Sequence, residues 1–142
     1  MIYTKLTCEA MKIAYEAHHT QVDKGGVPYI FHPIHLAEQM TDELSTCVAL
    51  LHDVAEDTNV TLDKLSETFP KEVMDALALL THTDGTDYYT YVEKIKTNPI
   101  ARAVKLADLT HNSDKTRTAG IIDEAAQKRL EEKYRRAFEI LG

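Results

Sequence analysis

The stretch ALLHDVAED, residues 49–57, decides the fold of this chain, because it runs from an apolar segment directly into a group of polar side chains. Leu50, Leu51 and Val54 have the three- and four-residue spacing of a helix face that packs against a core. Neither this stretch nor any other alternates with the period of two that predicts a strand. We therefore expect a buried helix that holds polar side chains at the edge of a helical core.

The same helical periodicity extends over most of the chain, and capping residues and prolines mark where the helices begin. The predicted helices begin near Leu6, Pro33, Ser45 or Thr46, Thr61, the residue after Pro70, Thr86 or Asp87, Pro99 and Asp123. Residues 27–31 form a short segment that we expect to be extended, without a partner strand. Because we find no linker and no repeat, the sequence predicts an all-α fold of about seven or eight helices, with residues 1–142 as a single compact domain.

The composition excludes several classes of protein. The chain has 142 residues, with 16 Lys and Arg against 23 Asp and Glu, and its net charge of −7 disfavours a basic nucleic-acid-binding surface. No apolar run approaches the ~20 residues that span a bilayer, and the first residues do not resemble a secretory signal. We therefore expect a cytoplasmic protein with no nucleic-acid or membrane partner. Cys8 and Cys47 fall inside apolar helical patterns, which predicts buried, reduced thiols.

Four polar side chains of the stretch have the spacing of a chemical site. On a continuous helix, His52 and Glu56 are four residues apart, as are Asp53 and Asp57, and such pairs have Cβ atoms ~5–6 Å apart. Three carboxylates this close repel one another, and a divalent cation is the simplest compensation. A solvated acidic helix end is the alternative that spacing alone leaves open.

Two other segments supply candidate metal ligands. His32 lies in a stiff segment between Phe31 and Pro33, and Asp108 lies close to an apolar helical stripe. Taken singly, each is more often a hydrogen-bonded core group than a ligand. Together with His52 and Asp53 they form a set of imidazoles and carboxylates, which suits Mn, Fe, Co, Ni or Zn rather than Ca.

Three motifs in order carry a family resemblance. They are AHHTQVDKGGVPYIFHP at 17–33, ALLHDVAEDT at 49–58, and VKLAD at 104–108 followed by His111 and Asn112. The chain resembles the HD-domain metal-dependent phosphohydrolases, and among these the hydrolase domain of the RelA/SpoT family and the stand-alone small alarmone hydrolases. The resemblance spans residues ~10–115 and implies one HD-domain helical bundle.

The resemblance implies a role for each matching residue. One divalent metal, usually manganese, would be held by two imidazoles and two carboxylates, namely His32, His52, Asp53 and Asp108. The carboxylates of Glu56 and Asp57 would orient or deprotonate the attacking water. The nucleotide would be contacted by four side chains, namely Lys24, Asn112, Thr81 and Tyr88. The implied reaction releases pyrophosphate from the 3′ position of a guanosine alarmone such as ppGpp.

Thr20 stands where the family frequently has glycine, and two further departures from the family's pattern change the charge. Asp23 stands where alarmone hydrolases usually have arginine immediately before Lys24, and Leu109 stands where a basic residue is frequent. Both differences remove positive charge expected near the substrate. Two alternatives therefore stay open: a phosphohydrolase for another nucleotide, such as a 5′-monophosphate or a cyclic nucleotide, and a metal- or nucleotide-binding regulatory module without turnover. The sequence leaves the oligomeric state open.

Overall fold

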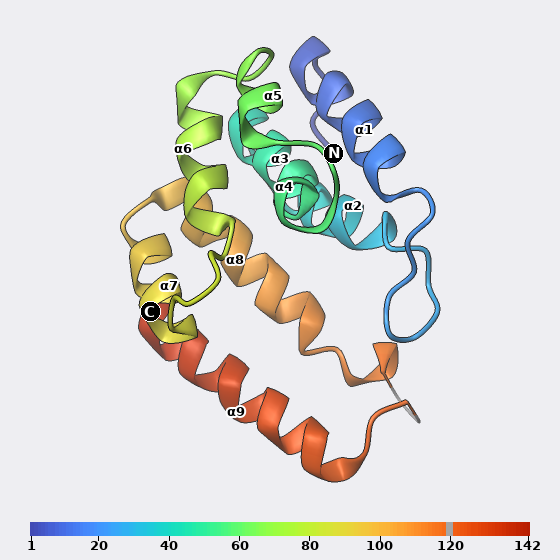
Figure 1. The fold of residues 1–142 in the computed structure, drawn as a ribbon, viewed down its shortest axis with the longest axis vertical. Helices are drawn as coiled ribbons and strands as arrows, with labels where there is room; N and C mark the ends of the chain where they lie inside the picture. The colour runs from blue at the N-terminus through green and yellow to red at the C-terminus, as the bar shows by residue number, and fades with distance from the viewer. Residues whose placement is uncertain (119–120) are drawn as a thin grey trace.

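The computed structural model describes residues 1–118 and 121–142, and these form a bundle of helices (Figure 1). The helices are α1 (Lys5–His18), α2 (Phe31–Glu38), α3 (Glu43–Leu51), α4 (Val54–Asp57), α5 (Leu62–Ser66), α6 (Lys71–Leu80), α7 (Tyr88–Lys96), α8 (Pro99–Asn112), the 3₁₀ turn η1 (Lys115–Arg117) and α9 (Glu124–Leu141). The described residues include no strand, only one isolated bridge between Val22 and Pro28. The all-α prediction is confirmed. Within the described ranges, no helix has the length and apolar character needed to cross a membrane.

Helix α3 lies at the centre of the bundle because it is apolar on every side. Its residues from Ser45 to Leu51 are all buried, as expected for a helix without a polar face. It packs against α1, α2, α6 and α8. Helix α8 crosses the middle of the molecule, and α9 runs along one edge, packed on α7 and α8 (Figure 1).

Most predicted helix starts are confirmed by their caps. Thr61, Asp87 and Asp123 each accept a backbone N–H of the first turn that follows them. The predicted cap of α3 is wrong, because the side chain of Asp42, and not of Ser45 or Thr46, accepts the hydrogen bond. Asp42 is extended and can therefore turn its carboxylate back onto the first helical N–H groups.

The expected continuous helix through residue 57 is also wrong. Asp53 has φ −107° and ψ 0° and separates α3 from α4, so the eight predicted helices become nine α-helices in the described part of the chain. The two thiols are free, with Cys47 buried as predicted and Cys8 half-buried.

Candidate metal centre

The four predicted metal ligands meet where α2, α8 and the turn after α3 come together. His32 Nε2 lies 2.9 Å from Asp108 Oδ1. His52 Nε2 lies 3.0 Å from Asp53 Oδ2 and 3.7 Å from Asp108 Oδ1. One ligand atom each from His32, His52 and Asp53 lie within 4.8 Å of one another. Side chains from three separate segments thus surround one small volume that a single ion can share.

The break between α3 and α4 is what places two of these ligands together. Side chains of adjacent helical residues point about 100° apart. The bridge-region backbone of Asp53 interrupts the helix, and its carboxylate then lies beside the ring of His52. The break lies between the adjacent residues His52 and Asp53. Both side chains can therefore face the same candidate metal position, which a continuous helix would not allow.

The hydrogen bonds of His52 show that this group of atoms fits a cation. Nδ1 lies 2.7 Å from the carbonyl oxygen of Ala49 and must donate its proton there. The neutral ring then has a lone pair on Nε2, which is buried and has no hydrogen-bond partner among the described residues. That lone pair faces carboxylate oxygens of Asp53 and Asp108. Such a set of electron-pair donors is repulsive unless a proton or a metal ion lies between them.

The pKa shifts of His52 and Asp53 also indicate that the site favours a positive charge. Burial alone would lower the pKa of His52, but the carboxylates of Asp53 and Asp108 outweigh it and raise that pKa well above its ordinary value. Burial would raise the pKa of Asp53, yet the charge of His52 lowers it to about 2. A proton and a metal ion therefore compete for one position, as at metal sites in general.

Three side chains without a predicted role hold the predicted ligands in place. Lys105 Nζ donates to Asp108 Oδ2 at 3.0 Å in a buried ion pair. The Tyr29 hydroxyl donates to Asp53 Oδ2. His111 Nδ1 lies 2.7 Å from His32 Nδ1. The sequence could have indicated the contact of Lys105 with Asp108, because residues three apart lie on one face of a helix. Tyr29 lies within the first motif, but nothing in the sequence indicated its contact with Asp53.

Glu56 and Asp57 lie on α4, directly beside the four ligands. One oxygen each from Asp53, Glu56 and Asp57 lie within 4.8 Å of one another. Burial, and then the charge of Asp53, raise the pKa of both Glu56 and Asp57. Glu56 also accepts the backbone N–H of His82 at 3.0 Å, which fixes its carboxylate. A carboxylate of raised proton affinity next to a metal site is suited to take a proton from water.

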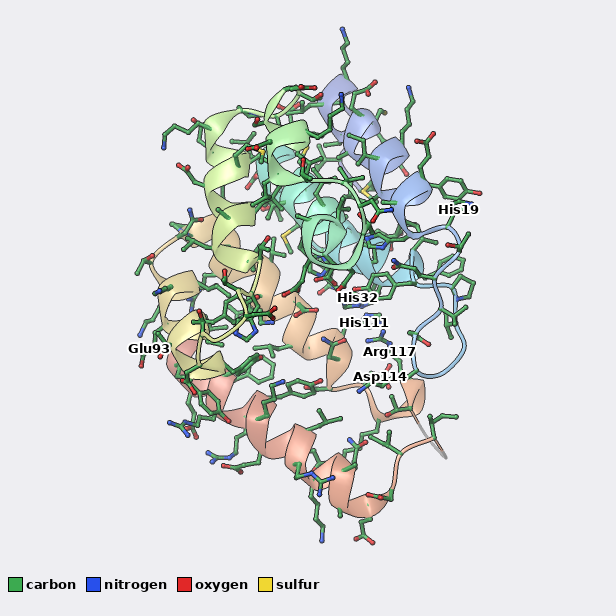
Figure 2. All side chains as sticks on the ribbon, viewed as in Figure 1. His19, His32, Glu93, His111, Asp114 and Arg117 are labelled. Atoms are coloured by element: carbon green, nitrogen blue, oxygen red, sulfur yellow. The ribbon has the colours of Figure 1, made fainter. Side chains whose placement is uncertain are left out.

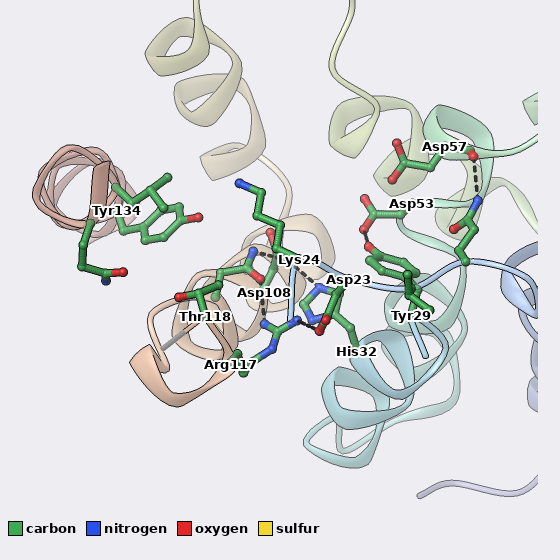
Figure 3. Close-up of a pocket in the computed structure, with 15 residues that line it drawn as sticks. Asp23, Lys24, Tyr29, His32, Asp53, Asp57, Asp108, Arg117, Thr118 and Tyr134 are labelled. Carbon is green, nitrogen blue, oxygen red and sulfur yellow. Dashed lines mark hydrogen bonds and ion pairs between the residues drawn. The ribbon is translucent and has the colours of Figure 1, made fainter. Parts of the chain in front are cut away.

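A cavity of about 640 Å³ opens onto this centre (Figure 3). Two of the four predicted substrate contacts, Lys24 and Asn112, line it. Thr81 and Tyr88 are not among its lining residues: the Thr81 hydroxyl donates to the carbonyl of Leu77, and the Tyr88 ring lies under Lys133 Nζ, 4.2 Å from the ring centroid. Asn112 donates to Asp108 Oδ1 at 3.1 Å.

The two departures from the family's pattern that change the charge have different structural outcomes. Leu109 is fully buried in the core and does not line the cavity. Asp23 lines the cavity, but its carboxylate is paired with Arg117 at 3.4 Å. Arg117 therefore brings a positive charge to the rim that the sequence analysis missed. No sequence signal could have found this pair, because 94 residues separate its members.

Comparisons with known proteins show which family the chain belongs to and which proteins it is similar to. The profile of a family described as HD domain matches residues 10–140. A probable GTP pyrophosphokinase of Mycobacterium leprae is 33% identical over 116 residues, which cover 72% of this chain and 15% of that protein. A guanosine-3′,5′-bis(diphosphate) 3′-pyrophosphohydrolase of Borreliella burgdorferi is 33% identical over 121 residues, 73% of this chain and 18% of that protein. The chain thus spans less than a fifth of these relatives' length.

A solved structure has the same fold. It is described as a metazoan ortholog of SpoT that hydrolyses ppGpp. The two superpose with a TM-score of 0.84 over 99% of this chain and 88% of that one, at 21% sequence identity.

Proposed function

The chain belongs to the HD-domain family, and from this premise we propose that it is a metal-dependent phosphohydrolase that releases diphosphate from the 3′ position of a guanosine alarmone. The observation that carries the proposal is the meeting of His32, His52, Asp53 and Asp108 beside the carboxylates of Glu56 and Asp57. Of these six residues, His32, Asp53, Asp57 and Asp108 line the cavity. The reaction named for relatives such as the Borreliella burgdorferi protein supports this choice of substrate.

We assign the ion to His32, His52, Asp53 and Asp108 and propose that it is Mn²⁺. Two imidazoles and two carboxylates suit a transition metal of this kind. When bound, such an ion would supply positive charge that lowers the pKa of water and offsets the charge of the phosphoryl oxygens. The Ala49 carbonyl fixes the ring of His52, and the Lys105 ammonium fixes the carboxylate of Asp108, so neither has to reorient.

The remaining residues act on water and on the nucleotide. Glu56 and Asp57 orient the attacking water and accept its proton, which their raised pKa values favour. Lys24 and Asn112 line the cavity and contact the nucleotide. Thr81 and Tyr88, which do not line the cavity, stay predicted substrate contacts. We propose that the chain acts in the cytoplasm, which a nucleotide substrate favours.

The test is a product assay with purified protein loaded with Mn²⁺. A panel of nucleotides would contain a 3′,5′-bis(diphosphate) of guanosine, 5′-monophosphates and cyclic nucleotides. The proposal expects equal amounts of diphosphate and guanosine 5′-diphosphate from the first compound only. Inorganic phosphate from a monophosphate would indicate a different HD phosphohydrolase. Tight metal binding without turnover of any compound would indicate a regulatory module.

A further inference from the structure

Two cationic side chains, Lys24 and Arg117, line the cavity together with several carboxylates (Figure 3). Asp53 and Asp57 lie on the side of the metal centre, whereas Lys24 and Arg117 lie on the rim formed by residues 23–27 and η1. Tyr134 of α9 faces them across the opening (Figure 3). The lining also includes the carboxylates of Asp23, Asp53, Asp57 and Asp108. The two cations therefore favour negative charge on the part of a ligand that lies at this rim.

The guanidinium of Arg117 is held in one orientation by three acceptors. Nη1 donates to the carbonyl of His111 at 3.1 Å and to Asn112 Oδ1 at 3.0 Å, and Nη2 pairs with Asp23 Oδ2. The side chain is only 19% exposed. A guanidinium has five N–H donors, so these bonds leave two of them for a ligand. Arg117 is thus a fixed cation, and a ligand need not order it.

The carboxylate of Asp23 is occupied by contacts within the rim of the cavity. Its Oδ1 accepts the backbone N–H groups of Gly25 at 2.9 Å and Val27 at 3.0 Å, and its Oδ2 faces Arg117. The loop and η1 are in direct contact, because a Cβ on Gly25 would lie 2.2 Å from the carbonyl oxygen of Arg117. The two segments therefore form one unit in which the negative charge of Asp23 is directed at Arg117.

The position of this unit shows which part of a ligand it meets. Arg117 contacts Asn112, and Asn112 contacts Asp108. Figure 2 labels His32, His111 and Arg117 in the same region of the molecule, and no hydrogen bond or ion pair joins the guanidinium directly to a proposed metal ligand in the described part of the chain. The side chain of Asn112 lies between Arg117 and Asp108, so an anionic group at the guanidinium is best placed to be one that does not react at the metal centre.

We propose that Arg117 is a specificity-determining residue that binds the phosphate groups at the non-reacting end of the nucleotide, and that Asp23 positions its guanidinium. This inference rests on the proposed function, and it deepens that function: the preferred substrate carries phosphates at both ends. Besides Lys24 of the loop, η1 thus supplies a second cation to this rim, although residue 23 of the loop is acidic.

The test is calorimetric titration of the metal-free protein with guanosine 5′-diphosphate, which has only the non-reacting phosphates. Loss of a charge-assisted hydrogen bond should make Arg117→Gln bind this probe at least about tenfold more weakly than the wild type. The matched control is Lys115→Gln in the same turn, whose side chain is 68% exposed and pairs with Glu131. It should change the dissociation constant less than about twofold. Equal weakening by both variants, or no weakening by Arg117→Gln, would overturn the proposal.

Asp23→Asn separates positioning from simple charge. The amide keeps an oxygen for the N–H groups of Gly25 and Val27 but loses the negative charge that faces Arg117. Coulomb's law alone predicts tighter binding of a diphosphate once that charge is removed. Positioning predicts weaker binding, by about threefold or more, because the guanidinium is no longer held. Unchanged or tighter binding would overturn the role of Asp23.

Steady-state kinetics distinguishes this inference from the proposed function. If guanosine 3′,5′-bis(diphosphate) is hydrolysed, Arg117→Gln should raise KM for it while kcat falls less than about threefold, and KM for the analogue without 5′ phosphates should not change. Equal losses on both compounds would show that Arg117 acts through the metal centre. If no compound is hydrolysed but probe binding still depends on Arg117, the proposed function fails and the phosphate site stands.

Discussion

Replacing Lys105 by methionine removes the one buried ammonium group that contacts a proposed metal ligand in the described part of the chain. Lys105 Nζ lies 3.0 Å from Asp108 Oδ2, and at an effective dielectric of 20 the gross attraction over that distance is about 5.5 kcal/mol. Desolvation offsets part of it, and breaking a buried pair costs ~3–5 kcal/mol. For a chain of this length, that loss corresponds to a fall in Tm of about 10–15 °C. Methionine keeps most of the apolar volume between Tyr88 and Tyr91.

The loss of stability should depend on the metal. In metal-free protein the carboxylate of Asp108 would be left buried without its ammonium partner, whereas Mn²⁺ would supply the missing positive charge. We therefore expect the fall in Tm to be less than half as large with saturating Mn²⁺, measured by differential scanning calorimetry. The control is Lys71→Met, which removes an exposed pair with Asp75 and should have little effect. The same fall with and without Mn²⁺ would refute the reasoning.

Three further outcomes follow from the geometry. Asp53→Ala should abolish Mn²⁺ binding in calorimetric titrations while the helical circular dichroism survives; metal binding of wild-type strength would remove Asp53 from the centre. Glu56→Gln should keep the metal and lose ~10²–10⁴-fold in kcat, unlike the exposed Glu67→Gln, and equal kcat values for both would exclude Glu56 as the base. Gly25→Ala should lower the free energy of unfolding by ~1–3 kcal/mol, because the new Cβ meets the Arg117 carbonyl; unchanged denaturant midpoints would contradict that contact.

Local sequence signals predicted the helices because helix formation depends on residues up to four positions apart. The caps at Thr61, Asp87 and Asp123 act on N–H groups within the next turn, and the apolar period of the stretch around Leu50 reports burial directly. The same locality explains the error at Asp53. Helical spacing favours a continuous helix at this position. The break appears only in the tertiary structure, where the carboxylate of Asp53 accepts a hydrogen bond from the Tyr29 hydroxyl and lies beside the ring of His52.

The candidate ligands were a different kind of prediction. His52 and Asp53 are adjacent, but His32 and Asp108 are 76 residues apart, and spacing cannot show that they meet. That these four residues bind one metal was expected because three motifs of the chain, in the same order, resemble those of the HD-domain phosphohydrolases. The structure brings these side chains together and adds the residues that orient them, of which Lys105 lies on the helix of Asp108 and Tyr29 lies on the segment before α2.

The amino-acid sequence by itself determined the helical class, most helix starts and the donor types available to a metal, because each depends on near neighbours or on side-chain chemistry. Only the tertiary structure decided where the charges of the cavity lie. In the sequence, Asp23 stands where the family usually has a positively charged arginine. In the structure, the 23–27 loop packs against η1 and pairs Asp23 with Arg117. The electrostatic effect of a charged residue depends on the distance and direction to its partner, and for segments 94 residues apart the packing of the chain sets both.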